Sequence, residues 1–188
     1  MFAPELKESR NRSLERFVTQ HQREVHPYLY SLADVPWAVF GTLTWEQAGI
    51  RRDTNYARFE RSKDFNLLLK LTRIRFKLHS RYLAYYQCTE WGAAMQCHYH
   101  FLIAKAGVEK VPSTELAAEM QRLWCSEINQ TGLGQAVVRP FIEAEQMRGV
   151  GYCLKREYDG KGVERERYDN LSPALLKQLT QGLALQTL

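Results

Sequence analysis

The chain has 188 residues, of which 45% are hydrophobic and 12% aromatic, a composition that excludes a disordered protein and allows a core of its own. Its formal net charge of +5 favours an acidic partner, most commonly nucleic acid. No apolar run reaches the length of a membrane span, and the charged N-terminus lacks the apolar centre of a signal peptide. We therefore expect one cytoplasmic domain over residues 1–188, with no membrane contact.

Hydrophobic periodicity and chain breakers divide this domain into nine expected elements. In chain order these are a helix at 4–25, a strand at 37–45, a helix at 54–80, strands at 82–89 and 96–104, a helix at 113–129, a strand at 135–141, and helices at 143–157 and 173–186. The charged stretch 158–170 is expected to be a loop. The central βαββαβ order predicts an α+β fold, in which an antiparallel sheet with a ferredoxin-like core at about 36–157 carries flanking helices.

The periodicity of side chains assigns faces within one expected strand and one expected helix. On the first strand, Val39, Gly41 and Leu43 share one face, while Phe40, Thr42 and Thr44 share the other. In the following helix, apolar residues at helical spacing predict a stripe that faces the core, formed by Leu67, Leu68, Leu71, Ile74 and Leu78. Ser172-Pro173 is a typical helix start.

Positive charge is concentrated in one segment. Between Arg51 and Arg81 there are ten Lys or Arg residues against three acidic ones, a net +7 that exceeds the charge of the whole chain. Arg51, Arg52, Arg73 and Lys77 are our candidates for contacts with nucleic-acid phosphates. The alternative is a solvated helix surface, which is the usual explanation for charge on a helix.

Two histidines occupy alternate positions of an expected strand, in the sequence His98-Tyr99-His100. Residues two apart on a strand share a face, so the two imidazoles are placed to share a metal ion. A pair of ordinary half-buried histidines is the alternative.

A second chemical motif lies about fifty residues further on. In an expected helix, Tyr152 and Lys155 are three residues apart and share a face. A phenol, whose pKa is about 10, attacks poorly unless a cation stabilises the developing phenolate. Beside a metal that polarises a phosphate, this pair therefore suits phosphoryl transfer. A tyrosine and lysine at this spacing carry little information alone, and the combination with the histidines is what gives them weight.

Three segments in this order resemble the HUH endonucleases, specifically the rolling-circle replication initiator (Rep) proteins. They are Phe40-Gly41-Thr42-Leu43-Thr44, His98-Tyr99-His100 and Tyr152-Cys153-Leu154-Lys155, with Tyr99 standing where a bulky apolar residue is usual. The resemblance implies the HUH nuclease fold. It also implies a third metal ligand about eight residues before the histidines, which is Glu90, with Gln87 as the alternative. Two imidazoles and a carboxylate with open positions suit Mn²⁺ or Mg²⁺ better than a closed structural zinc site.

The resemblance further implies a metal-dependent, site-specific endonuclease and strand transferase for single-stranded DNA. Tyr152 would attack a backbone phosphate and leave a 5′-phosphotyrosine link and a free 3′-OH. Position 156 is Arg, so a second tyrosine four residues from the first is missing and the enzyme would be of the one-tyrosine type. The implied partners are single-stranded DNA at a hairpin-bearing replication origin, a host helicase and a polymerase.

Other functions remain open from the sequence. A transposase or relaxase would use the same chemistry, although a relaxase usually has a third histidine, and none follows within five residues of His100. A non-catalytic nucleic-acid-binding relative would keep the fold without turnover. An α+β metalloprotein unrelated to DNA is the third alternative, and the excess charge of residues 51–81 counts against it.

Overall fold

The structure is a computed structural model, and it describes residues 32–45, 55–78, 83–91, 97–128, 135–142, 150, 153 and 169–184. Its elements are η1 (Leu32–Asp34), β1 (Trp37–Thr44), α4 (Asn55–Arg75), β2 (Tyr85–Trp91), β3 (Cys97–Ala104), α5 (Ser113–Leu123), η2 (Trp124–Ile128), β4 (Ala136–Pro140), β5 (Asp169–Leu171) and α7 (Pro173–Ala184). The helix expected at 4–25 lies outside the described residues.

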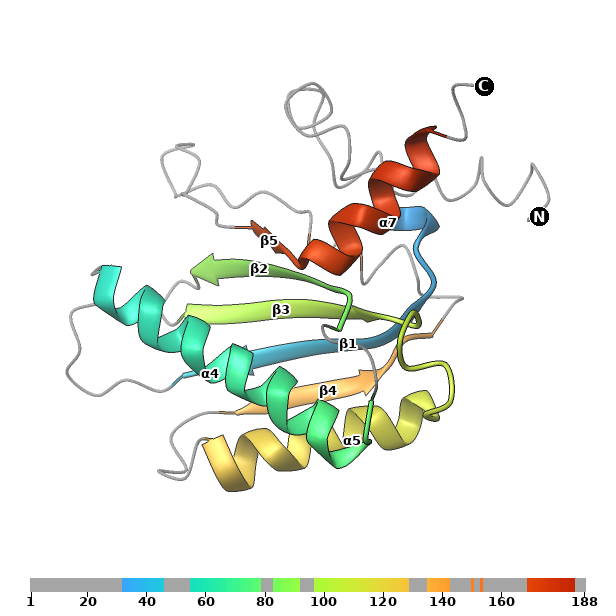
Figure 1. The fold of residues 1–188 in the computed structure, drawn as a ribbon. Coiled ribbons are helices and arrows are strands. Elements are labelled where there is room, and N and C mark those ends of the chain that lie inside the picture. The colour runs from blue at the N-terminus through green and yellow to red at the C-terminus, as the bar shows by residue number, and fades with distance from the viewer. Residues whose placement is uncertain are drawn as a thin grey trace.

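The five strands form one antiparallel sheet in the order β4-β1-β3-β2-β5 (Figure 1). Strands β1 to β4 with α4 and α5 give the βαββαβ order, so the expected α+β, ferredoxin-like arrangement is confirmed. Strand β5 is an addition. It pairs Asp169–Leu171 with β2, where the sequence predicted a loop up to residue 170.

Helices cover both faces of this sheet, and each face has its own core. On one face, Phe65 and Leu68 of α4 and Met120 of α5 pack with Tyr99 and Phe101 of β3. On the other face, α7 packs against β2 (Figure 1). The residues of this second core, which we call the α7-side cluster, include Tyr86, Cys88, Leu102, Leu175 and Leu179. The sheet therefore separates whatever its two faces carry.

Strand β1 alternates as predicted. Val39 and Leu43 are fully buried against the helices, while Phe40, Thr42 and Thr44 on the other face are half-buried. Gly41 lies directly opposite Phe101 of β3, and a Cβ at position 41 would overlap the Phe101 ring. Glycine is thus required here because the phenyl ring packs against the bare backbone of β1.

The apolar stripe predicted for α4 is wrong at two of its positions. Leu67 is 40% exposed and Ile74 is 62% exposed. The buried residues of α4 are Arg61, Phe65, Leu68, Leu69 and Thr72, of which only Leu68 belongs to the predicted stripe. Both sets have helical spacing, so periodicity alone cannot decide which set meets the sheet.

The start of α7 follows the prediction. Ser172 is buried and precedes Pro173, the first helical residue, and its Oγ accepts hydrogen bonds from the backbone N–H groups of Leu175 at 3.1 Å and Tyr85 at 2.9 Å. One hydroxyl therefore caps α7 and ties its first turn to β2. Among the described residues, no helix is long and apolar enough to cross a membrane.

Candidate functional site

His98 and His100 lie on β3, on the face of the sheet opposite α4 and α5. Their ring centroids are 6.4 Å apart and the ring planes make an angle of 32°. His100 is buried, with 4% of its surface exposed, whereas His98 is half-buried. The prediction that the two imidazoles share a face is confirmed.

Strand β1 fixes the orientation of the His100 ring. Thr42 is the direct cross-strand partner of His100, and its Oγ1 lies 2.9 Å from Nδ1 of the imidazole. The ring of Phe40 is nearly parallel to that of His100, with an angle of 8° and a centroid distance of 6.3 Å. A hydrogen bond and a stacked neighbour thus hold one of the two histidines in place.

Glu90 belongs to β2, which continues beyond the expected strand end at residue 89, and it pairs directly with His98 in the β2–β3 ladder. Directly paired residues share a face of the sheet, so the register places Glu90 with the histidines. Gln87 pairs with Phe101 on the face that packs against α4 and α5, and its amide donates to Thr89 Oγ1 at 3.1 Å. The register therefore favours Glu90 over Gln87 as the third ligand that the sequence left open.

These residues fit a divalent metal by their donor set. Two imidazoles and one carboxylate leave coordination positions open, as catalytic sites require. Metal–nitrogen bonds of about 2.0–2.1 Å put neighbouring imidazole centroids roughly 5 Å apart, which is less than the observed spacing. The half-buried His98 ring has more room to close this gap than the buried His100 ring. Among the residues whose side chains the structure describes, which do not include Glu90, no group of three potential ligands gathers.

The segment that carries the predicted nucleophile is described at two positions. Val150 and Cys153 are helical and fully buried, and both belong to the α7-side cluster. That cluster also contains Cys88, the direct cross-strand partner of His100. Val150 and Cys153, which stand near Tyr152 in the sequence, therefore pack on the histidine-bearing face. Tyr152 and Lys155 themselves lie outside the described residues.

Arg139 of β4 is a candidate that the sequence reasoning missed. It is exposed and pairs directly with Phe40, and its guanidinium carbon lies 5.4 Å from the centroid of the Phe40 ring. A row of Arg139, Phe40 and His100 thus crosses three adjacent strands on one face. Strand alternation could have placed Phe40 with Thr42, but only the strand order brings Arg139 beside them.

The predicted phosphate contacts on α4 are not brought together with the histidines. Helix α4 packs on the opposite face of the sheet, where Phe65 meets Tyr99 at a centroid distance of 6.1 Å. Arg73 is half-buried and Lys77 exposed. Arg51 and Arg52 lie outside the described residues.

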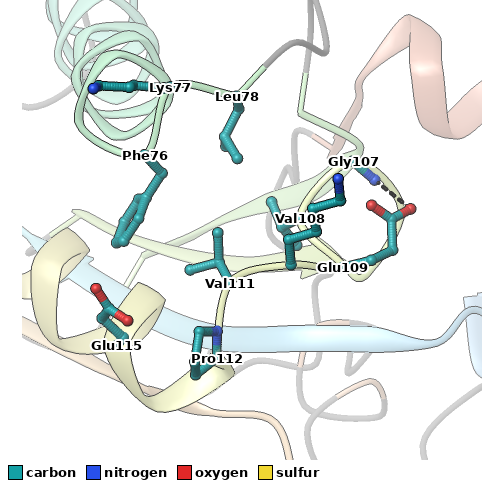
Figure 2. A pocket seen from close by; sticks show the side chains of 10 residues that line it. Phe76, Lys77, Leu78, Gly107, Val108, Glu109, Val111, Pro112 and Glu115 are labelled. Carbon is teal, nitrogen blue, oxygen red and sulfur yellow. Dashed lines mark hydrogen bonds between the residues drawn. The ribbon is translucent and has the colours of Figure 1, made fainter.

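Lys77 follows the last turn of α4, beside a hollow of about 520 Å³ (Figure 2). Apolar side chains line much of this hollow, among them Phe76, Leu78, Val108 and Val111. Glu109, on its rim, accepts a hydrogen bond from the backbone N–H of Gly107 at 2.9 Å. The hollow lies on the side of the sheet that α4 and α5 cover, so it is separate from the histidine site.

Residues 38–157 match the model of a family of replication-associated proteins, one of whose named types is ORF2. The match spans more than half of the chain, so the protein belongs to this family and is a replication-associated protein. The matched range contains all three motifs, from Phe40 to Lys155. No curated protein and no solved structure matches the chain.

Proposed function

We propose that this protein is a metal-dependent, site-specific endonuclease and strand transferase that nicks single-stranded DNA to initiate rolling-circle replication. The observation that carries the proposal is the packing of Val150 and Cys153 in the same cluster as Cys88, which pairs with His100. Val150 and Cys153, which stand near Tyr152 in the sequence, thereby lie on the same face of the sheet as the two histidines. Membership in a replication-associated family supplies the biological context.

In this proposal the chain's own groups perform the strand transfer. The Tyr152 hydroxyl attacks the phosphorus, and its proton passes to solvent. The bond between phosphorus and the 3′ oxygen breaks, and that oxygen takes up a proton to become a free 3′-OH. Tyr152 is left esterified to the 5′ phosphate. Lys155 offsets the negative charge that develops on the phenolate and the phosphate.

His98, His100 and Glu90 are the residues that would hold the metal in this mechanism. When bound, Mn²⁺ or Mg²⁺ supplies Lewis-acid polarisation of the scissile phosphate. The burial of His100 and its contact with Thr42 keep this ring preorganised, so less reorganisation is needed as the site assembles.

Two surfaces would bind the DNA. Arg139 and Phe40, on the histidine face, suit a single strand, because an arginine contacts phosphate and an aromatic ring stacks on bases. Arg73 and Lys77 are separated from that face by the sheet, so they would contact DNA away from the cut. Arg51 and Arg52 complete the proposed set of phosphate contacts.

The one-tyrosine pattern predicts one covalent link per active site, so a second cleavage needs another protomer or water. Within this proposal, a host helicase opens the duplex and a polymerase extends the free 3′-OH. The substrate is a single strand exposed at the replication origin.

The test is covalent capture. Labelled single-stranded oligonucleotides that form hairpins of varied sequence are incubated with Mn²⁺ and the wild-type protein, and adducts are located by mass spectrometry of the peptides. We expect a 5′-phosphoryl adduct on Tyr152 that Tyr152→Phe abolishes. Tyr158→Phe is the matched control, because it removes the same hydroxyl six residues further on and should leave the adduct intact.

Other outcomes identify the alternatives. Salt-dependent DNA binding without an adduct across the whole library would indicate a non-catalytic relative. An absence of DNA binding would contradict the proposal outright. An adduct that joins its 5′ end to a second DNA, with no replication from the free 3′-OH, would indicate a transposase.

A further inference from the structure

The contact between Thr42 and His100 joins residues that are 58 positions apart in the chain. They pair directly in the β1–β3 ladder, and Oγ1 of Thr42 lies 2.9 Å from Nδ1 of His100. Since His100 is only 4% exposed, solvent offers this nitrogen little competition. Nδ1 of His100 therefore forms its hydrogen bond with Thr42 and not with water.

The direction of this hydrogen bond decides what the other ring nitrogen can do. A neutral imidazole has one N–H and one lone pair. If Nδ1–H donates to the Thr42 oxygen, the lone pair is on Nε2, where a metal can bind it. If the Thr42 hydroxyl donates to Nδ1, then Nε2 carries the hydrogen and cannot act as a ligand.

Metal-ligating histidines generally donate their second N–H to an oxygen acceptor, which fixes both the tautomer and the ring orientation. We propose that Thr42 is a positioning residue whose hydroxyl oxygen accepts the hydrogen bond from Nδ1–H of His100 and so presents the Nε2 lone pair to a divalent cation. This inference rests on the proposed function in that it assumes a metal at the histidines. It adds that His100 binds through Nε2 and that a threonine on another strand selects this state.

The stacking of Phe40 on His100 supports the same role. The Phe40 ring plane lies at 8° to the imidazole plane. This stacking constrains the orientation of the imidazole, as the hydrogen bond to Thr42 also does. His98, which is half-buried, has a less enclosed ring. His100 is accordingly the preorganised member of the pair, and His98 is the one that adjusts.

The tautomer is read directly by NMR. Long-range ¹H–¹⁵N correlations in metal-free, ¹⁵N-labelled protein identify which nitrogen of His100 is protonated, and titration with Mn²⁺ gives the affinity. We expect wild type to show the Nδ1–H form. Thr42→Val should give a mixture of tautomers and a loss of Mn²⁺ affinity of about 10- to 100-fold, the usual effect of removing such a partner. Thr42→Ser retains the hydroxyl and should recover most of the affinity.

Thr44→Val is the matched control. It removes a hydroxyl from the same face of the same strand, but this hydroxyl bonds to the backbone of Gln135, at 3.2 Å to its carbonyl oxygen and 2.9 Å from its nitrogen. The His100 tautomer should be unchanged in this variant. Thermal unfolding of each variant separates loss of fold from loss of the hydrogen bond.

Three results would overturn the inference: an Nε2–H tautomer in wild type, an unchanged Mn²⁺ affinity in folded Thr42→Val, or equal losses in the serine and valine variants. None of these arms requires DNA cleavage. Normal Mn²⁺ binding with an Nε2–H tautomer would reject the role of Thr42 alone. An Nδ1–H tautomer without any Mn²⁺ binding would reject this role together with the metal site of the proposed function.

Discussion

Glu90 and His98 are direct cross-strand partners in the β2–β3 ladder. The expected strand ended at residue 89, so the sequence left Glu90 in the connection to the next strand, where a carboxylate has no fixed relation to a neighbouring strand. Because β2 continues to Trp91, Glu90 is instead held in register with His98. A carboxylate position and two imidazoles thereby belong to one face of the sheet.

This pairing predicts the effect of Glu90→Gln on metal binding. The substitution keeps the size of the side chain and removes its charge. Mn²⁺ affinity, measured by calorimetric titration, should therefore fall by at least about tenfold. This is the lower end of the loss observed when a residue that hydrogen-bonds a metal ligand is removed. Gln87→Ala is the control, because Gln87 lies on the opposite face. Unchanged affinity in Glu90→Gln, or a comparable loss in Gln87→Ala, would contradict the assignment of Glu90.

Gly41→Ala should destabilise the fold, because the added methyl group overlaps the ring of Phe101. Overpacking of this kind costs about 1–3 kcal/mol, which urea unfolding would detect as a lower midpoint. The double variant Gly41→Ala with Phe101→Leu has space for the methyl group. The cost of the alanine should therefore be smaller in the leucine background, and strictly additive effects would argue against this contact.

Lys77→Gly should stabilise the protein. Lys77 has φ = 50°, a left-handed conformation, and the N–H of the next residue, Leu78, bonds to the carbonyl of Arg73 at 3.0 Å to close the helix. Glycine adopts this conformation without the Cβ penalty, so we expect about 0.5–1 kcal/mol of added stability in urea unfolding. Lys77→Ala removes the same charge but keeps the strain.

The two Lys77 variants also separate stability from DNA binding. If Lys77 contacts phosphate, both should weaken salt-dependent DNA affinity to the same extent, although only the glycine variant gains stability. A glycine variant no more stable than the alanine variant would show that the backbone at this position is not strained.

Glu119 predicts a component of stability that depends on pH. The hydrogen bonds from Arg122, with a further contribution from Arg75 of α4, hold the pKa of the Glu119 carboxyl below its usual 4.5. A lowered pKa means that the folded state favours the ionised form. The stabilisation is therefore complete above the usual value and is lost as the pH falls through the lowered one.

The measurement compares wild type with Glu119→Gln in urea at two pH values. At pH 7 the wild type should be more stable by about 0.5–1 kcal/mol, because both arginines are largely solvent-exposed. At pH 3 the difference should shrink, and 1 M salt at pH 7 should reduce it as well. A difference that is the same under all three conditions would mean that the effect is not electrostatic.

Features with a short-range cause could be predicted from the sequence. The common face of His98 and His100 follows from the two-residue period of a strand, and the start of α7 at Ser172-Pro173 follows from local capping chemistry. The βαββαβ order followed from hydrophobic periodicity and was sufficient to give the fold.

What the sequence determined by itself was thus the order of β1 to β4 with α4 and α5, and the faces within β1 and β3, because both depend on neighbouring residues. The tertiary structure decided which face of α4 is buried, that Glu90 pairs with His98, and that Thr42 meets His100. It also placed Arg73 and Lys77 on the other side of the sheet from the histidines. The Thr42–His100 contact and the packing of α4 depend on residues dozens of positions apart in the chain, whereas the Glu90–His98 pair depends on where β2 ends and on its register with β3.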